Sequence, residues 1–252
     1  MQKSSTSIKI ILVVLLFFSS YTNQIFADEN SNDPKIKFLE KKLLEIIPKY
    51  KFNKIKKSPI NNIYEIVYGG EVLYITGDAK FIFESGNLQK IIKDDEQNAY
   101  YFKNITEVSA AEGRKNLLNT IPDAKLFVYG KSEKYTINVV TDIDCPYCRK
   151  FHRDIQKYIE NGIKVRYLVF TVKTSSKNKV ISAWCARDQN KAFTLLKEEK
   201  TLNKKSCKNP IEEHQDIISS IGVSSTPSMF LSDGSLIQGY LSPEEVMQII
   251  KN

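Results

Sequence analysis

The chain has 252 residues, of which 42% are hydrophobic and 26% charged, and its formal net charge at pH 7 is +8. This length fits one large domain or two modest ones, and this hydrophobic content argues against a disordered chain. Lysines are dense between Lys35 and Lys57. Because no nucleic-acid motif and no aromatic interleaving accompany them, we interpret them as a solvated basic face and expect no nucleic-acid partner.

The N-terminus has the pattern of a secretory signal peptide. A short basic stretch precedes the apolar run Ile10–Phe18, and a polar segment then leads to a cleavage site near Ala27. The alternative is a transmembrane anchor, but this run is about half as long as the roughly 20 residues that a membrane-spanning helix needs. We therefore expect residues 1–27 to be removed and the mature protein to be exported to a compartment where disulfides persist.

The first half of the mature chain predicts a small α+β unit at residues 28–104. Apolar residues recur at helical spacing in 34–49, a helix that we expect to end near Pro48, and residues 63–77 and 80–86 read as antiparallel strands. A unit of this size is marginally stable alone, and dimerisation is a common remedy. The polar stretch 93–104 indicates a boundary, and residues 105–121 predict a helical connector.

The second half, residues 122–252, alternates between strands and helices. The expected elements in chain order are a strand at 136–143, a helix from Cys145 to Gly162, a strand at 163–170, a polar and helical region at 176–220, a hairpin within 223–241 and a final helix from Ser242. This alternation is typical of an α/β domain. We interpret Trp184, Tyr100 and Tyr101 as packing residues.

Two cysteines, Cys145 and Cys148, occur in the segment DCPYCRKFH directly after the first of these strands. They could be half of a zinc site, but Cys185, Cys207 and two histidines do not supply a second closely spaced ligand pair. They could form a structural disulfide, but so small a loop removes little entropy from the unfolded chain. A redox pair explains the placement better, because a cysteine at a helix N-terminus has a lowered pKa.

In this interpretation Cys145 is the exposed, attacking thiol, and Cys148, one turn into the helix, resolves the mixed disulfide. Pro146 suits the first turn of that helix, where its missing N–H costs little. Thr226-Pro227 lies between apolar segments, and its peptide bond is either cis, in a bend beside the cysteines, or that of an ordinary trans loop proline. We interpret His152 as a packing or surface residue, and Asp144 as either a helix cap or an acid near the thiols.

The chain contains, in this order, the segments TDIDCPYC, AWCARDQNKAF, GVSSTP and GYLSPEE. With these segments in this order, it resembles the DsbC/DsbG family of periplasmic disulfide isomerases. The resemblance implies a thioredoxin-like catalytic domain with a helical insertion, preceded by a small α+β dimerisation domain. It also implies a homodimer whose cleft receives misfolded, disulfide-containing secreted proteins, and a DsbD-type membrane reductase as partner. It implies no cofactor and no metal.

Residue by residue, Cys145 and Cys148 match the family's catalytic pair, and Cys185 and Cys207 match the second, structural disulfide of DsbC. The alternative for Cys185 and Cys207 is two free buried thiols. The candidate substrate-binding residues are Pro146, Tyr147, Thr226 and Pro227. One feature departs from DsbC, which usually has Gly before the Tyr of this motif, because CPYC is the DsbG pattern. The dipeptide tunes the redox potential, so the balance between isomerase and reductase stays open.

We therefore expect a periplasmic protein disulfide isomerase and reductase that also has chaperone activity. Three alternatives remain. They are a DsbG-like reductase of sulfenylated cysteines, a DsbA-like dithiol oxidase, and a holdase chaperone that does not need thiols. Replacing Cys145 by Ser separates the last of these from the enzymes.

Overall fold

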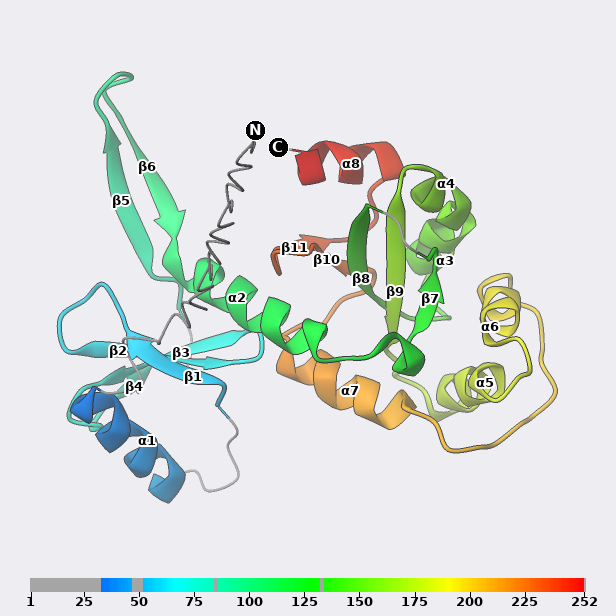
Figure 1. Cartoon of the computed structure of the whole chain (residues 1–252), viewed down its shortest axis with the longest axis horizontal. Helices are drawn as coiled ribbons and strands as arrows, with labels where there is room; N and C mark the ends of the chain where they lie inside the picture. The colour runs from blue at the N-terminus through cyan, green and yellow to red at the C-terminus, as the bar shows by residue number, and fades with distance from the viewer. Residues whose placement is uncertain (1–32, 47–51, 84–85, 132–133, 252) are drawn as a thin grey trace, which may run out of the picture.

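The computed structural model describes residues 33–46, 52–83, 86–131 and 134–251. The expected signal peptide and the expected helix end near Pro48 lie outside the described residues. Two structural units stand side by side, and the helix α2 (Ile105–Asn119) runs from one to the other (Figure 1). No helix within the described ranges is long and apolar enough to cross a membrane.

The N-terminal unit contains the helix α1 (Pro34–Ile46) and a four-stranded antiparallel sheet in the order β1-β2-β3-β4. The strands are β1 (Lys54–Lys57), β2 (Ile63–Tyr68), β3 (Glu71–Thr76) and β4 (Ile82–Phe83). Leu39 and Leu43 of α1 pack against Ile55 and Ile66 of the sheet. The expected hairpin at Gly69-Gly70 joins β2 to β3, whereas β1 was not expected from the sequence.

Residues 93–104, which the sequence indicated as a boundary, belong instead to a two-stranded ribbon. The strands β5 (Gln89–Asp94) and β6 (Ala99–Asn104) pair antiparallel with each other, and the ribbon projects away from both units (Figure 1). Tyr100 and Tyr101 are 65% and 51% exposed, so their interpretation as packing residues is wrong within the single chain. Trp184, in contrast, is buried as expected.

The C-terminal unit is built on a five-stranded sheet in the order β11-β10-β8-β9-β7. Its strands are β7 (Phe127–Tyr129), β8 (Tyr135–Thr141), β9 (Ile163–Val169), β10 (Ser228–Phe230) and β11 (Leu236–Gln238). The central pair β8 and β9 is parallel, while β7, β10 and β11 each run antiparallel to a neighbour. The sequence predicted four of these strands and missed the short edge strand β7.

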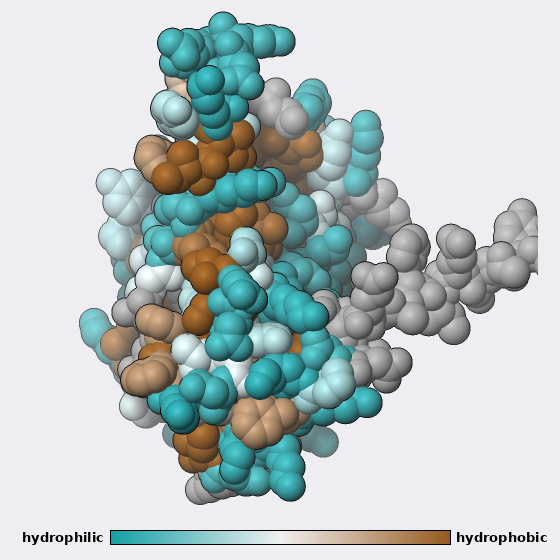
Figure 2. Space-filling view, turned by 90° about the vertical axis from the view of Figure 1, so that its left-hand side faces the viewer, coloured by the Kyte–Doolittle hydropathy of each residue, from teal (hydrophilic) through white to brown (hydrophobic). Residues whose placement is uncertain are grey.

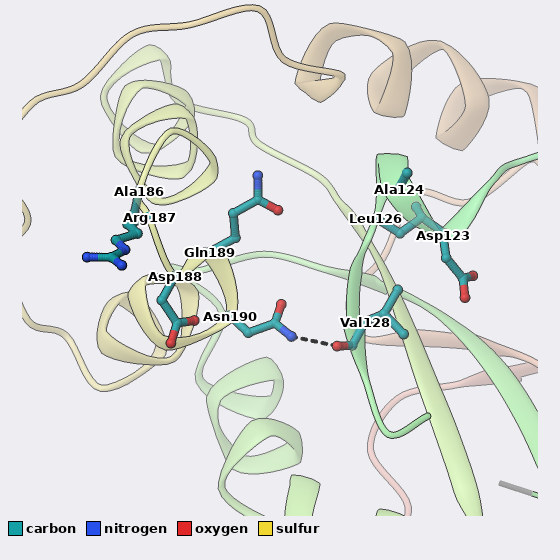
Figure 3. A pocket seen from close by; sticks show the side chains of 9 residues that line it. All are labelled: Asp123, Ala124, Leu126, Val128, Ala186, Arg187, Asp188, Gln189 and Asn190. Atoms are coloured by element: carbon teal, nitrogen blue, oxygen red, sulfur yellow. Dashed lines mark hydrogen bonds between the residues drawn. The ribbon is translucent and has the colours of Figure 1, made fainter. Parts of the chain in front are cut away.

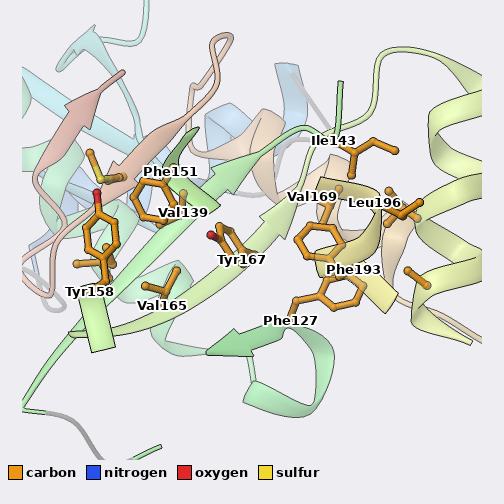
Figure 4. Close-up of a cluster of buried hydrophobic side chains, with 14 of the residues drawn as sticks. Phe127, Val139, Ile143, Phe151, Tyr158, Val165, Tyr167, Val169, Phe193 and Leu196 are labelled. Carbon is orange, nitrogen blue, oxygen red and sulfur yellow. The ribbon is translucent and has the colours of Figure 1, made fainter. Parts of the chain in front are cut away.

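Helices cover both faces of this sheet. Val139 and Tyr167 point to one face, together with Phe151 and Phe193 from the covering helices (Figure 4). Val140 and Leu168, the next residues along the two strands, point to the other face, as the period of two requires. The helices are α3 (Pro146–Arg153), α4 (Ile155–Glu160), α5 (Thr174–Trp184), α6 (Gln189–Lys197), α7 (Ile211–Ser220) and α8 (Pro243–Lys251).

The expected continuous helix from Cys145 to Gly162 is broken in the structure. Asp154, with φ −91° and ψ 6°, ends α3 and begins α4. The hydroxyl of Tyr240 donates a hydrogen bond to its carboxylate at 2.8 Å, and Lys157 pairs with the same carboxylate at 2.9 Å. Tertiary partners thus stabilise a break that helical periodicity alone does not reveal. Gly162 follows α4 with φ +77°.

The two units are joined closely through α2. The guanidinium of Arg114 on this helix donates from Nε to the carbonyl oxygen of Gly234 at 2.8 Å, and Arg114 is only 3% exposed. Gly234 has φ +87°, and a Cβ there would lie 1.9 Å from the carbonyl oxygen of Ala111. A second contact is the N–H of Gly70, which donates to the carbonyl of Ser220 at 2.9 Å. Glycine at position 234 therefore allows α2 to lie against the β10–β11 turn.

Candidate functional site

The segment between β8 and α3 holds Cys145 at the start of the helix. Cys145 is the N-cap residue of α3, and its sulfur accepts a hydrogen bond from the backbone N–H of Cys148 at 3.4 Å. The carbonyl oxygen of Cys145 accepts the first helical hydrogen bond, from Arg149 N, at 3.1 Å. Pro146 follows at the first helical position, where no N–H is needed. The sulfur thus lies at the positive end of the helix dipole.

This position lowers the pKa of Cys145. Partial burial raises the pKa, but hydrogen bonds from the backbone N–H and the thiol of Cys148, and from the backbone N–H of Tyr147, outweigh it. Cys145 is partly exposed, and Tyr147 beside it is 64% exposed. A partly exposed thiol with a lowered pKa is the form of cysteine that attacks disulfides at neutral pH.

Cys148 has the opposite environment. It is fully buried, and its sulfur accepts a hydrogen bond from the backbone N–H of Asp142 at 3.4 Å. Burial raises the pKa of Cys148, although the nearby ammonium of Lys197 acts against this. Both thiols are free in the structure. The two cysteines are therefore adjacent but differ in access and acidity.

The loop before β10 faces the cysteines. The peptide bond between Thr226 and Pro227 is cis, and the thiol of Cys145 donates to the carbonyl oxygen of Thr226 at 3.3 Å. Pro227 is buried and Thr226 is half-buried. The structure thus brings Thr226-Pro227, 81 residues further along the chain, against Cys145.

A buried cation that was not predicted from the sequence lies behind the cysteines. Lys197, at the C-terminal end of α6, is 3% exposed, and its Nζ donates to the hydroxyl of Thr141 at 2.6 Å and to the carbonyl of Asp142 at 2.9 Å. Burial lowers the pKa of Lys197 to about 8. Its spacing was the available signal, because Lys197 falls four residues after the buried Phe193 and thus on the same face of the helix.

The helices between β9 and β10 also hold the segment that precedes Cys145. The hydroxyl of Ser176 on α5 donates to the carboxylate of Asp144, so this acid is tied to the insertion, and the cap of α3 is Cys145 rather than Asp144. Arg149 donates from Nε to the carbonyl of Ile143 at 2.9 Å and pairs with Glu199 at 2.7 Å. The insertion therefore fixes the loop that carries the attacking thiol.

His152 is a packing residue in this structure. It is 4% exposed, and its ring nitrogens lie 3.2 Å from the hydroxyl of Tyr167 and 3.0 Å from that of Thr194. Burial, with a further contribution from Lys197, lowers the pKa of His152 to about 3. The ring is therefore neutral at physiological pH.

The other two cysteines are bonded to each other. A disulfide joins Cys185, at the end of α5, to Cys207 in the segment before α7, with the two Cα atoms 5.8 Å apart. Among the described residues, no group of three or more histidine, cysteine or acidic side chains could hold a metal ion. His214, one of the ligand candidates considered from the sequence, instead donates a hydrogen bond from Nε2 to the carbonyl oxygen of Lys125 at 2.7 Å.

A hollow of about 760 Å³ lies elsewhere, between the β7 region and the loop that joins α5 to α6 (Figure 3). Asn190 lines this hollow and donates a hydrogen bond from Nδ2 to the carbonyl oxygen of Val128 at 2.6 Å. Neither cysteine of the free pair lines this hollow. The candidate site is thus the surface around Cys145, and not this hollow.

The site contains a free cysteine pair at the N-terminus of a helix that follows a central parallel strand, and the pair faces a loop with a proline. This arrangement defines a thiol:disulfide oxidoreductase. Residues 122–252 match the family model for a thioredoxin-like domain, and residues 26–98 match that for the N-terminal domain of disulfide bond isomerase proteins. The thiol:disulfide interchange protein DsbC of Escherichia coli strain K12 is 31% identical over 204 residues, which cover 79% of this chain and 81% of that protein.

DsbC of Salmonella typhimurium is 32% identical over 195 residues, covering 76% of this chain and 78% of the relative. A crystal structure of a disulfide interchange protein from Neisseria gonorrhoeae has a TM-score of 0.47 at 22% identity, covering 52% of this chain and 96% of that chain. On the family models and the relatives, the chain belongs to the DsbC family of thiol:disulfide interchange proteins. The predicted fold class and the predicted enzyme class are confirmed.

Proposed function

We propose that the protein is an isomerase and reductase of disulfides in misfolded secreted proteins, and that Cys145 and Cys148 are its catalytic pair. The observation that carries this proposal is the difference between the two thiols. Cys145 is partly exposed with a lowered pKa, whereas Cys148 is buried with a raised pKa. The first can attack a substrate disulfide, and the second is protected until that attack has occurred.

In the reaction, the Cys145 thiolate attacks one sulfur of a wrong disulfide. A mixed disulfide forms, and the other substrate sulfur leaves as a thiolate that takes a proton from solvent. If another substrate thiolate then attacks the mixed disulfide, a new substrate disulfide forms and Cys145 is released, which completes isomerisation. If Cys148 attacks Cys145 instead, the substrate leaves reduced and the enzyme is oxidised.

The surface around Cys145 supports a role in substrate binding for Pro146, Tyr147, Thr226 and Pro227. Pro146 and Tyr147 are exposed beside the sulfur, and the Thr226 carbonyl lies 3.3 Å from it. An extended substrate segment can lie along this loop and present its disulfide to Cys145. The cysteines, these four residues and the Cys185–Cys207 disulfide make up the proposed functional set.

We also propose that the protein is a homodimer assembled through its N-terminal unit. The proposed domains are this unit at residues 28–104, a connector at 105–121 and a catalytic domain at 122–252. The exposed apolar side chains of this unit are concentrated on β4 and the β5–β6 ribbon, and Figure 2 shows apolar surface on this side of the molecule. Those on or beside these strands are Phe81, Ile82, Phe83, Ile91, Tyr100, Tyr101 and Phe102, and the same unit also exposes Phe38, Leu44, Ile46 and Ile60. So large an exposed apolar surface is unusual on a monomer.

The proposed setting is the periplasm, with export directed by residues 1–27. There a DsbD-type membrane reductase would return the oxidised pair to the dithiol, and the dimer cleft would give chaperone activity. Acid-quenching intact cells, alkylating free thiols and mapping the labels by mass spectrometry tests the redox part. Label on Cys145 and Cys148 supports the isomerase and reductase. Protection of both would indicate a dithiol oxidase.

Replacing single cysteines tests the catalytic assignment. Cys145→Ser should abolish the refolding of a scrambled disulfide protein, while Cys148→Ser should accumulate mixed disulfides at Cys145 because the resolving thiol is gone. Suppression of aggregation should survive Cys145→Ser if the chaperone activity does not need thiols. If Cys145→Ser retains full isomerase activity, the catalytic assignment is wrong.

A further inference from the structure

Lys197 is a buried cation whose hydrogen-bond acceptors are both uncharged. The side chain is enclosed by aromatic rings, with its Nζ 5.2 Å from the ring centroid of Phe193 and 5.8 Å from that of Tyr167. Its acceptors are the hydroxyl of Thr141 and the carbonyl of Asp142. Burying an ammonium group is costly, and lysine is rarely found fully buried without a charged partner. The position therefore calls for a negative group nearby.

The sulfur of Cys148, when ionised, is the group that attracts Lys197 most strongly, ahead of the carboxylate of Asp142. Thr141 and Asp142 lie between the ammonium and the sulfur, since Asp142 donates its N–H to Cys148 and accepts from Lys197 through its carbonyl. The hydroxyl of Thr141 also hydrogen-bonds to both side chains. Attraction to Lys197 lowers the pKa of Cys148 against the effect of burial, and Cys148 in turn is the main group that raises the pKa of Lys197.

We propose that Lys197 is a positioning residue for the resolving step, the internal counter-cation that stabilises the thiolate of Cys148. This inference rests on the proposed function, in which Cys148 resolves the mixed disulfide. In that step the Cys148 thiolate attacks the sulfur of Cys145, the bond between Cys145 and the substrate breaks, and the substrate leaves as a thiolate. Lys197 increases the fraction of Cys148 that carries the required charge, and it sets how often a substrate is released reduced.

Other charged or titratable groups surround the pair. His152 is neutral near physiological pH because its pKa is about 3, and burial raises the pKa of Tyr167, which is also neutral. Arg149 acts to lower the pKa of Lys197, while the Asp142 carboxylate and Cys145 act to raise it. Once Cys145 is held in a mixed disulfide it no longer titrates.

The test measures the pH dependence of the resolving step. Reduced protein is mixed with a large excess of oxidised glutathione, and the decay of the Cys145–glutathione mixed disulfide is followed by acid quench and mass spectrometry between pH 6 and 10. Lys197→Met keeps the length of the side chain and removes its charge. We expect the midpoint of the pH profile to rise by about one unit and the rate at pH 7 to fall about tenfold.

Lys191→Met is the matched control, because it removes the same charge from an exposed position of the same helix. Its profile should coincide with that of the wild type. An unshifted midpoint in a folded Lys197→Met variant, or an equal shift in Lys191→Met, overturns the inference. Loss of packing alone would change the rate at every pH without moving the midpoint.

A second measurement avoids any change at Lys197. The pKa of its ammonium is followed by NMR of ¹³C-labelled lysine in the wild type and in Cys148→Ala. Because coupling between two sites is reciprocal, removing Cys148 should lower the pKa of Lys197. An unchanged pKa overturns the inference even if Lys197→Met does not fold. The proposed function fails separately, if Cys145→Ser remains active or if Cys145 and Cys148 are both oxidised in intact cells.

Discussion

The backbone N–H of Cys148 donates a hydrogen bond to the sulfur of Cys145 at 3.4 Å, so the buried member of the pair helps to activate the exposed one. The contact exists because Cys145 is the N-cap of α3 and Cys148 is its third helical residue. The spacing of two residues between the cysteines is therefore a requirement of helix geometry, because an N-cap side chain reaches the N–H groups of the second and third helical residues.

The first prediction concerns the reactivity of the two thiols. The pKa of Cys145 is lowered and that of Cys148 is raised. At neutral pH a larger fraction of Cys145 than of Cys148 is therefore thiolate. In the reduced protein at pH 7, iodoacetamide should label Cys145 at least about tenfold faster than Cys148. Mass spectrometry of peptides after short labelling times measures both rates. Equal rates in the folded protein would contradict the asymmetry, and unfolding in urea is the control that should equalise them.

The cysteine positions and the main strands could be predicted because their signals are local. Apolar runs at 136–143 and 163–170 predict β8 and β9, and the cysteines follow the first run directly. The ribbon β5–β6 could not be predicted in the same way, because its apolar residues stand in blocks and do not alternate with polar ones, and no residue of it is buried in the single chain. The edge strand β7 has only three residues, and it forms by pairing with β9, a partner distant in sequence.

The site shows the same division between local and distant information. The order of the cysteines along one helix indicated which is exposed, because a helix buries its residues periodically. The role of Asp144 was left open from sequence, and the structure ties it to Ser176 on a separate helix. Lys197 was missed because a lysine at the end of α6 is expected to be exposed unless its contact with Thr141 of β8 is known.

A second prediction concerns the disulfide between Cys185 and Cys207. It closes a loop between residues that are 22 positions apart, and the loss of such a loop constraint costs roughly 3 kcal/mol of stability by the chain-entropy model. The variant Cys185→Ala with Cys207→Ala should therefore have a lower free energy of unfolding by about that amount, measured by urea denaturation. The early rate of attack by Cys145 should change little, because neither cysteine lies at the free pair. No loss of stability would contradict the structural role.

A third prediction tests how α2 lies against the catalytic unit. Gly234→Ala should lower stability by about 1–3 kcal/mol, because alanine strains a backbone at φ +87° and its Cβ would meet the carbonyl of Ala111 at 1.9 Å. Gly239→Ala is the matched control, since Gly239 has φ +85° but nothing within 4 Å of an added Cβ. The difference between the two variants isolates the steric part. Faster amide exchange in α2 should accompany Gly234→Ala alone, and equal effects would argue against a close contact.

The last prediction concerns acid stability and His152. Its pKa is about 3 in the folded protein, whereas an unfolded histidine has a pKa near 6.5, so the unfolded state binds more protons between these values. The contribution of His152 to the free energy of unfolding is therefore fully present above pH 6.5. It falls as the pH drops, by about 1 kcal/mol per pH unit between pH 6.5 and 5. His152→Gln, which keeps a polar group for Thr194 and Tyr167, should remove that part of the slope in urea denaturation curves.

The chain has two histidines, and burial lowers the pKa of His214 as well, so the wild-type slope should contain contributions from both. His214→Gln serves as the comparison, since it should reduce the slope while leaving the part due to His152 intact. Carboxylates with lowered pKa values, such as that of Asp123, change their proton binding mainly below pH 5 and therefore lie outside this window. A slope that is the same in wild type and His152→Gln would mean that His152 is protonated in the folded protein, in conflict with its burial beside Lys197.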